Sequence, residues 1–179
     1  KTNLIYWAGF TPSLEQGRVN NIPNIEVEYY FIKRYSLSID AVYTPLVRKN
    51  EGTEWRYIDG FAVEPRVRLS NKNNDKSNFR GIYTGFYGIT GEFDFMYPPL
   101  GNYGYTGSYY GAGISLGVVF PLIKGLALEA GLRGGYRIDN WESYEAKDGS
   151  CYYMDSGSQR GFKLQGLRLN IVYRFGGKI

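Results

Sequence analysis

The stretch Gly166-Leu-Arg-Leu-Asn-Ile-Val-Tyr-Arg-Phe175 decides the fold class of this chain. Every second residue from Leu167 to Phe175 is apolar, and the residues between them are small or polar except for Val172. A period of two is typical of a β-strand with one apolar and one polar face. The run has about the length of a tilted strand that crosses a bilayer, roughly 9–11 residues. It also ends on an aromatic residue close to the C-terminus, as outer-membrane barrels commonly do.

Seven further segments have the composition of strands. They are 3–10, 24–31, 35–43, 57–69, 79–89, 110–120 and 126–138. Two of them are irregular. Pro65 falls in the apolar register of its segment, so we expect a bulge or a local irregularity there, because proline cannot donate to a ladder. In 79–89, Arg80 is in phase with Ile82 and Phe86, so the sequence does not assign the faces of this strand.

The connections between these eight segments alternate in length. Long connections are expected at 11–21, 45–56, 90–109 and 139–160, and the others are shorter. An even strand number with short turns at one end and long loops at the other is typical of outer-membrane barrels with both termini in the periplasm. The sequence therefore predicts an all-β fold in which residues 1–179 form one domain. That domain is an eight-stranded antiparallel up-and-down transmembrane β-barrel with short periplasmic turns and long extracellular loops.

The composition agrees with this fold class. Aromatic residues make up 17% of the chain, with 18 Tyr and 24 Gly, which favours strands, tight turns and interfacial belts. The sequence contains no run of apolar residues long enough for a transmembrane helix. The net charge of +4 is small and scattered, so we expect no nucleic-acid partner. We also expect that a cleaved signal peptide preceded Lys1.

Alternation alone also fits a soluble lipocalin-like barrel, whose apolar face points inward. The placement of charge favours the membrane alternative, because every lysine except Lys163 falls in a turn, a loop or a terminus. The polar face carries arginines and acids instead, and arginine is preferred for enclosed ion pairs. The predicted lumen charges are Glu26, Glu28, Asp40, Glu64, Arg66, Arg68, Glu129, Arg133, Arg137, Arg168 and Arg174.

Small residues share the polar face with these charges. They are Gly111, Gly113, Ser115, Gly117, Gly131 and Gly135, and they leave room for long side chains inside a narrow barrel. Aromatic residues gather near the ends of the apolar face, as in the two interfacial girdles of membrane barrels. They are Tyr35, Tyr43, Tyr110, Phe120, Tyr136, Tyr173 and Phe175. Tyr173 and Phe175 are also the predicted signal for the barrel-insertion machinery.

Several residue patterns bear on the chemistry that this chain could perform. The lumen charges fit either an ion pathway or a structural plug, and the plug is favoured because eight strands leave no aqueous channel. The chain has no His, and no paired carboxylates or Ser-Lys arrangement stands at a strand end. We therefore expect no enzyme activity, no catalytic residue, no cofactor and no metal. Cys151 is interpreted as an incidental loop thiol, with pairing to another chain as the alternative.

Cations in the expected extracellular loops fit two interpretations. They are Arg18, Arg48, Lys49 and Arg56. They are either contacts to the phosphates of lipopolysaccharide in the outer leaflet or ordinary surface charge.

Parts of the sequence resemble a Bacteroidota family of small outer-membrane proteins, which is catalogued as a domain of unknown function and is often encoded beside fimbrial genes. The segments that carry the resemblance are Lys1-Thr-Asn-Leu-Ile-Tyr-Trp7 with Thr11-Pro12, Tyr109-Tyr-Gly-Ala-Gly113 with Ser115 and Gly117, and Leu126-Ala-Leu-Glu129-Ala-Gly131 with Gly135-Tyr136. The chain departs from the family pattern at Glu64-Pro65-Arg66 and continues past Phe175. The resemblance implies a Gram-negative outer membrane and no catalytic residues.

These observations lead to one expected function and two alternatives. We expect a non-enzymatic outer-membrane barrel that acts as an accessory or scaffold subunit of a larger outer-membrane or surface-structure assembly complex. Its partners would be membrane lipid, lipopolysaccharide, other outer-membrane proteins and the insertion machinery. The first alternative is a small OmpA/OmpX-like porin or pore-forming barrel, and the second is a soluble lipocalin-like ligand-binding barrel.

Overall fold

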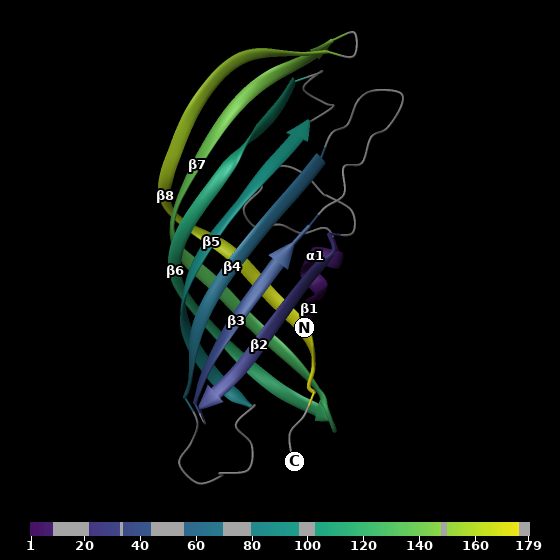
Figure 1. Ribbon diagram of the computed structural model, residues 1–179, viewed down its shortest axis with the longest axis vertical. Coiled ribbons are helices and arrows are strands. Elements are labelled where there is room, and N and C mark those ends of the chain that lie inside the picture. Colours follow the sequence, from purple (N-terminus) through teal and green to yellow (C-terminus); the bar gives the residue numbers. More distant parts are fainter. Residues whose placement is uncertain are drawn as a thin grey trace.

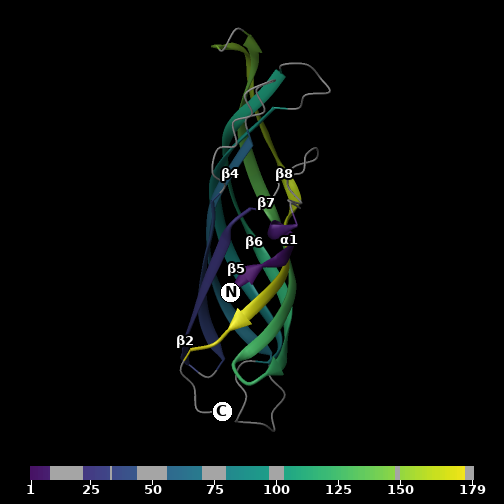
Figure 2. The same cartoon turned by 90° about the vertical axis from the view of Figure 1, so that its right-hand side faces the viewer.

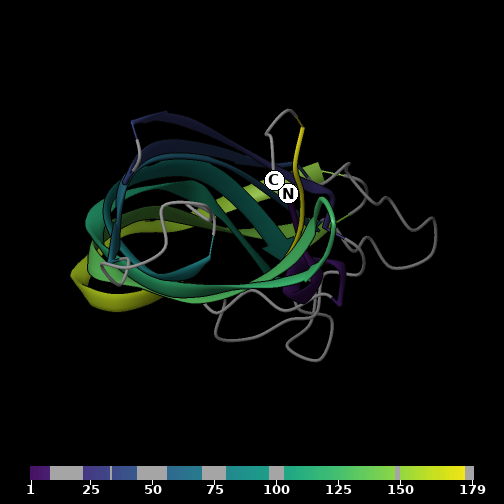
Figure 3. The same cartoon turned by 90° about the horizontal axis from the view of Figure 1, so that it is seen from below.

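The computed structural model describes residues 1–8, 22–32, 34–43, 56–69, 80–96, 103–147 and 150–175. These residues form one all-β unit, an antiparallel sheet of eight strands with up-and-down topology (Figure 1). The elements are β1 (Thr2–Asn3), α1 (Leu4–Trp7), β2 (Asn24–Ile32), β3 (Tyr35–Val42), β4 (Arg56–Leu69), β5 (Gly81–Met96), β6 (Tyr103–Ile123), β7 (Leu126–Lys147) and β8 (Ser150–Tyr173). Seen from below, the sheet curls around a common interior (Figure 3).

The strands follow one another in the sheet in the order β1-β8-β7-β6-β5-β4-β3-β2. β1 and β2 are therefore its two edges, and the N-terminal residues bridge them. On one side Thr2 pairs with Ile171 and Asn3 with Asn170. On the other side Lys1 and Glu26 exchange two backbone hydrogen bonds, of 2.8 and 2.9 Å. Figure 2 shows β1 and α1 beside β8.

The predicted strand over 3–10 is wrong from Leu4 to Ala8, and its last two residues lie outside the described ones. The Asn3 side chain accepts a hydrogen bond of 3.1 Å from the backbone N–H of Ile5 and caps α1, a single helical turn. Alternation of apolar residues over so short a run does not distinguish a strand from a turn of helix. The helix carries Tyr6 against a cluster of interior apolar residues.

The predicted long loops at 90–109 and 139–160 are also wrong. β5 continues to Met96 and β6 starts at Tyr103, while β7 continues to Lys147 and β8 starts at Ser150. The predicted loop at 11–21 and residues 45–55 of the loop predicted at 45–56 lie outside the described residues, as do Arg18, Arg48 and Lys49. Arg56 is the first residue of β4. Nothing is described of the side chain of Arg56.

The described sheet has two parts with different faces. The row Thr90–Tyr110–Ile138–Arg160 crosses β5, β6, β7 and β8 and divides the sheet. We call the part below this row, toward the β6–β7 turn, the body. We call the part of β5 to β8 above the row the extension. In the body, outward side chains are apolar and inward ones are charged, small or aromatic. In the extension, outward side chains are polar and inward ones are largely aromatic. None of the described helices is long and apolar enough to cross a bilayer.

The strand pairing is irregular at Pro65 of β4 and at two positions in β8. The β4–β5 ladder pairs Val63 with Gly88 and Arg66 with Gly85 but omits the residues between, at Pro65, without a change of register. Two bulges in β8 place an extra residue, Met154 and Gln165, opposite β7.

The faces of β5, which the sequence left open, are now assigned. Tyr83 and Tyr87 point inward and are buried, whereas Ile82 and Phe86 point outward and are exposed.

Candidate functional site

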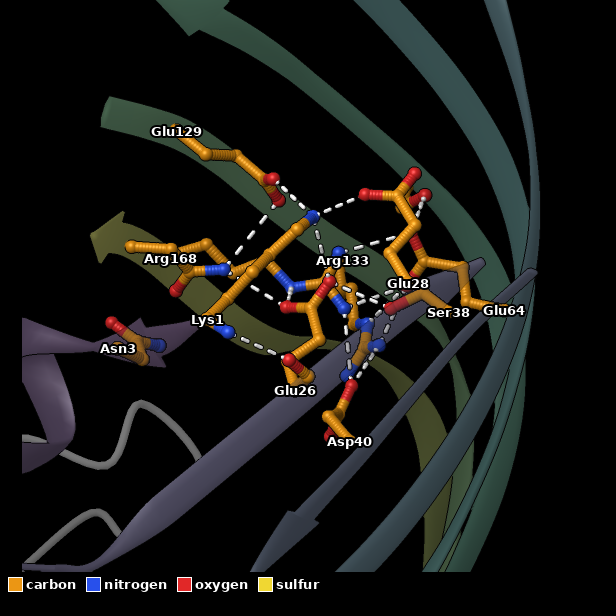
Figure 4. Close-up of polar contacts among 12 residues, drawn as sticks. Lys1, Asn3, Glu26, Glu28, Ser38, Asp40, Glu64, Glu129, Arg133 and Arg168 are labelled. Carbon is orange, nitrogen blue, oxygen red and sulfur yellow. Dashed lines mark hydrogen bonds and ion pairs between the residues drawn. The ribbon is translucent and has the colours of Figure 1, made fainter. Parts of the chain in front are cut away.

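A network of buried charges fills the middle of the body (Figure 4). Its members come from the N-terminus and from five strands, β2, β3, β4, β7 and β8. The cations are Lys1, Arg66, Arg68, Arg133 and Arg168, and the carboxylates are Glu26, Glu28, Asp40, Glu64 and Glu129. The five cationic side chains match the five carboxylates in number.

Glu64 is the centre of the network and is fully buried. Arg168 donates a hydrogen bond to each oxygen of Glu64, from Nη1 to Oε1 at 2.9 Å and from Nη2 to Oε2 at 2.7 Å. Arg66 Nε lies 2.6 Å from Oε1 and Arg133 Nε lies 2.7 Å from Oε2. The Ser115 hydroxyl donates a further bond of 2.7 Å. Such saturation is what a buried carboxylate requires to remain ionised at low cost.

A second centre lies where Lys1 meets three carboxylates. Oxygen atoms of Glu26, Glu28 and Glu129 lie within 4.8 Å of one another, close enough to hold a metal ion. The Lys1 ammonium already contacts all three, with Nζ at 3.0 Å from Glu26 and 2.5 Å from Glu129. The structure thus places the Lys1 ammonium among these three carboxylates.

Interior tyrosines complete the network, and sequence reasoning missed them. The Tyr83 hydroxyl donates to Glu129 at 2.8 Å, and the Arg66 guanidinium lies 4.7 Å from the centre of the Tyr83 ring. The Arg133 guanidinium likewise lies 5.2 Å from the centre of the Tyr87 ring. These rings occupy the space that the small residues leave, since a Cβ atom at Gly117 would lie 2.5 Å from Tyr83.

Apolar residues close the charged interior on both sides. Toward the extension lies a cluster of Ile22, Ile58, Phe93 and Tyr109, against which Tyr6 of α1 packs. Toward the β6–β7 turn lies a cluster of Tyr83, Val119, Ala127 and Val172. One cavity of about 20 Å³ lies beside the network, next to Asn3, Glu26 and Arg168, and it has room for about one water molecule.

Nine of the eleven predicted lumen charges belong to this network through the ion pairs given above. Arg137 forms a separate group nearer the extension, with Nε at 2.5 Å from Asp139, whose other oxygen is 2.7 Å from Lys163. Arg174 follows β8 and is partly buried at the other end. The exposed rings of Tyr173 and Phe175, the predicted insertion signal, contact each other with centroids 4.8 Å apart. Cys151 is exposed and lies in β8, not in a loop.

Chemically, the network is suited to hold strands together. Each of its carboxylates is already bonded to at least one cation, and Glu26 also accepts hydrogen bonds from Ser38 at 2.6 Å and from Asn170 at 2.9 Å. A general base or a nucleophile instead needs an accessible lone pair beside a place for substrate. The arrangement therefore resembles a structural plug that ties strands distant in the sequence to one another.

Comparison with known proteins identifies the family. The chain matches the family described as protein of unknown function, DUF3575, over residues 1–175, and it belongs to that family. Neither a curated protein nor a solved structure matches the chain.

Proposed function

We propose that this member of the DUF3575 family is an integral outer-membrane β-barrel of a Gram-negative bacterium and acts without catalysis. In this proposal it is an accessory or scaffold subunit of a larger outer-membrane or surface-structure assembly complex. The body is the membrane anchor, and the extension is the part that meets partners outside the membrane. The observation that carries the proposal is the abrupt change of the outer face from apolar to polar between the two parts.

The outer face of the body has the height of a bilayer core. On β6 every outward residue from Tyr110 to Phe120 is apolar, which is the length of a tilted membrane strand, roughly 9–11 residues. Large apolar side chains on this face are exposed, for example Phe86 at 71% and Ile114 at 52%. Exposed apolar surface of this extent on a water-soluble protein would lead to aggregation. A hydrocarbon environment removes that cost.

Aromatic residues border this apolar band, as interfacial girdles do. The upper border carries the exposed rings of Tyr43, Phe61, Tyr110, Tyr136 and Phe162. The lower border carries Phe31, Tyr35, Phe120, Tyr173 and Phe175. Tyr136 and Phe162 contact each other edge to face, with ring centroids 5.5 Å apart. The two borders favour a membrane position centred on the body.

Above the upper border the outer face is polar in two successive rows across the sheet. The first row is Glu92, Ser108, Asn140 and Ser158, and the second is Asp94, Thr106, Glu142 and Ser156. A surface of this kind is suited to water, so the extension would project beyond the outer leaflet. Lipopolysaccharide would surround its base, where Arg160 lies in the boundary row.

The alternatives fit the described residues less well. A pore needs an aqueous lumen, but the interior of the described body is filled by ion pairs, tyrosines and two apolar clusters. A lipocalin-like barrel needs an apolar interior for its ligand, whereas here the charges point inward and the apolar residues outward. An enzyme needs an accessible reactive group, and the interior carboxylates are saturated by cations.

The resemblance to proteins encoded beside fimbrial genes points to a Bacteroidota source and to surface assembly as the setting for the complex. The insertion machinery would recognise the end of β8, where Tyr173 and Phe175 remain exposed.

The test is isolation of the protein from its native membrane in mild detergent. We expect extraction only with detergent, partition into the detergent phase and co-purification with other outer-membrane proteins at fixed ratios. Recovery in aqueous buffer without detergent would refute the membrane assignment. A lone, monodisperse barrel from native membranes would refute the scaffold role, and reproducible single-channel currents from the purified protein would favour the pore.

A further inference from the structure

The β8 strand has a long edge that no described strand pairs with above the short contact with β1 and α1. β1 pairs with β8 only at Ile171 and Asn170, and the Asn3 side chain bonds the backbone of Leu167 and Leu169. From Ser150 to Leu164, β7 is the only described strand that pairs with β8. Edges of this kind are normally kept short, covered or interrupted by proline, because they are templates for another strand.

The backbone groups on this edge can be identified. The Leu167 carbonyl and the Leu169 N–H face the β1 side, and both residues point their side chains outward. Side-chain direction and hydrogen-bond direction alternate together along a strand. Beyond the bulge at Gln165, the outward residues that direct N–H and C=O groups to the open edge are Ser156, Ser158, Arg160, Phe162 and Leu164.

Bulges at Met154 and Gln165 delimit a regular run of β8, from Asp155 to Leu164. The run is roughly 30 Å long at the usual rise per strand residue. Most of its residues are exposed. Residues 155–159 of this run lie in the extension, Arg160 lies in the boundary row and residues 161–164 form the upper end of the body on β8. The part from 155 to 160 is therefore on the side that the proposed function places outside the membrane.

The inner face beside this edge has room for side chains of an incoming strand. A Cβ atom at Gly161 would meet nothing within 4 Å, so the space over this glycine is open. The indole of Trp141 lies over Gly157, 2.6 Å from where a Cβ atom would be. Trp141 is in turn part of an aromatic series with Tyr105, at a ring distance of 5.8 Å. An apolar side chain that faces inward at this edge would contact the indole and fill the space.

We propose that the edge of β8 from Asp155 to Leu164 is a docking site for an extended segment of a partner protein, which adds a strand to the sheet. The inward side chains of that segment are apolar and lie against Trp141 and over Gly161. The backbone ladder supplies most of the affinity, and these positions supply selectivity. The inference rests on the proposed function, because it names the surface through which the scaffold binds.

Two other occupants fit the geometry less well. A second copy paired antiparallel through the same edge would point its body in the opposite direction, so both bodies could not lie in one membrane. Lipopolysaccharide does not carry alternating donors and acceptors at the spacing of a strand, so it cannot complete the ladder. A strand of a different protein satisfies both requirements.

The first experiment is hydrogen exchange of single amides, in native outer-membrane vesicles and in purified protein. We expect the amides of Ser156, Ser158 and Arg160 to exchange at least roughly tenfold more slowly in native vesicles, because a strand hydrogen bond covers them there. Equal exchange rates in the two samples, with partners still co-purifying, would overturn the docking site but leave the proposed function standing. Loss of detergent dependence would overturn the proposed function itself.

The second experiment uses a photoreactive phenylalanine analogue at Arg160, with Tyr110 in the same row as the matched position away from the edge. We expect a protein crosslink from position 160 only. Ser158→Pro removes an edge N–H and leaves the β7 ladder intact, so the crosslink should fall roughly tenfold. Ser158→Ala keeps the N–H and should leave the crosslink unchanged. Heat-modifiable migration in gels checks that each variant is folded.

A third variant tests the docking site without a proline, which could itself disturb the fold. Gly161→Lys puts a charged chain into the open space, keeps every backbone donor and should also abolish the crosslink. A crosslink to lipopolysaccharide, to a second copy or within the chain would overturn the proposal, and so would a crosslink that resists both variants.

Discussion

The body and the extension are continuous in backbone but opposite in the chemistry of their faces. In the body, the row through Leu116 and Leu132 points apolar side chains outward, and the next row buries Arg133 beside Ser115. In the extension, the outward row carries Thr106 and Glu142, and aromatic rings face inward. The same four strands thus change from an inside-out sheet to one with an apolar inner face. A strand can pass from an apolar to a polar outer face without a break in its ladder, and only its side chains mark the boundary.

The comparison predicts the largest effect for removal of a buried carboxylate from the body. Glu64→Ala leaves Arg66, Arg133 and Arg168 without their shared partner and should destabilise the protein by about 3–5 kcal/mol. Urea unfolding in micelles, followed by heat-modifiable migration, measures this change.

The matched control for that substitution is Glu142→Gln on the outer face of the extension. Glu142 is exposed, so we expect a change of about 0.5 kcal/mol or less. Equal losses for the two variants would show that the interior network is not what holds the body together.

A charge on the outer face should give the next largest effect. Leu116→Arg places a cation near the middle of the apolar band and should cost about 2–4 kcal/mol in a bilayer. Ser108→Arg lies on the same strand just above the band and should cost close to nothing. Reversible folding into lipid vesicles measures both changes. Similar costs at the two positions would remove the boundary between body and extension.

The strands of the body were predictable from the sequence because apolar and polar residues alternate along them, with the apolar residues always on the outer face. Seven of the eight strands were located, and nine of the charges assigned to the interior lie together in it. The extension was not predictable in this way. Around Phe95 and Tyr105 the aromatic residues point inward and polar residues point outward. A search for an apolar outer face interprets such a stretch as a loop.

Three residues of the site, Lys1, Tyr83 and Tyr87, were not predicted from the sequence, for two physical reasons. Lys1 stands at the end of the chain, where a charge usually contacts solvent, yet it bonds three buried carboxylates. Tyr83 and Tyr87 lie in β5, whose faces could not be assigned from the sequence because Arg80 is in phase with Ile82 and Phe86. In the structure Arg80 precedes the strand and is exposed. A useful signal was present, since Tyr83 and Tyr87 pair with Gly117 and Gly113, large against small.

Apart from the control variants, the smallest effect is expected at a hydrogen bond between two strands of the extension. The Tyr144 hydroxyl donates to Asp94 at 2.6 Å, and the Tyr144 ring covers Gly104 of the strand between them. Tyr144→Phe keeps the ring and removes this bond, so it should cost about 1 kcal/mol. Because the bond lies in the extension and not in the body, the loss should appear as faster amide exchange in residues 140–147 while the urea midpoint of the body stays constant. The matched change in the body is Tyr83→Phe, which removes a hydroxyl from the buried Glu129. That variant should lower the midpoint itself, since an acceptor buried in the network loses a donor that water cannot replace.

If Tyr144→Phe lowered the midpoint as much as Tyr83→Phe, the two parts would unfold as one cooperative unit. The boundary would then separate two environments of a single structure and not two structures of different stability.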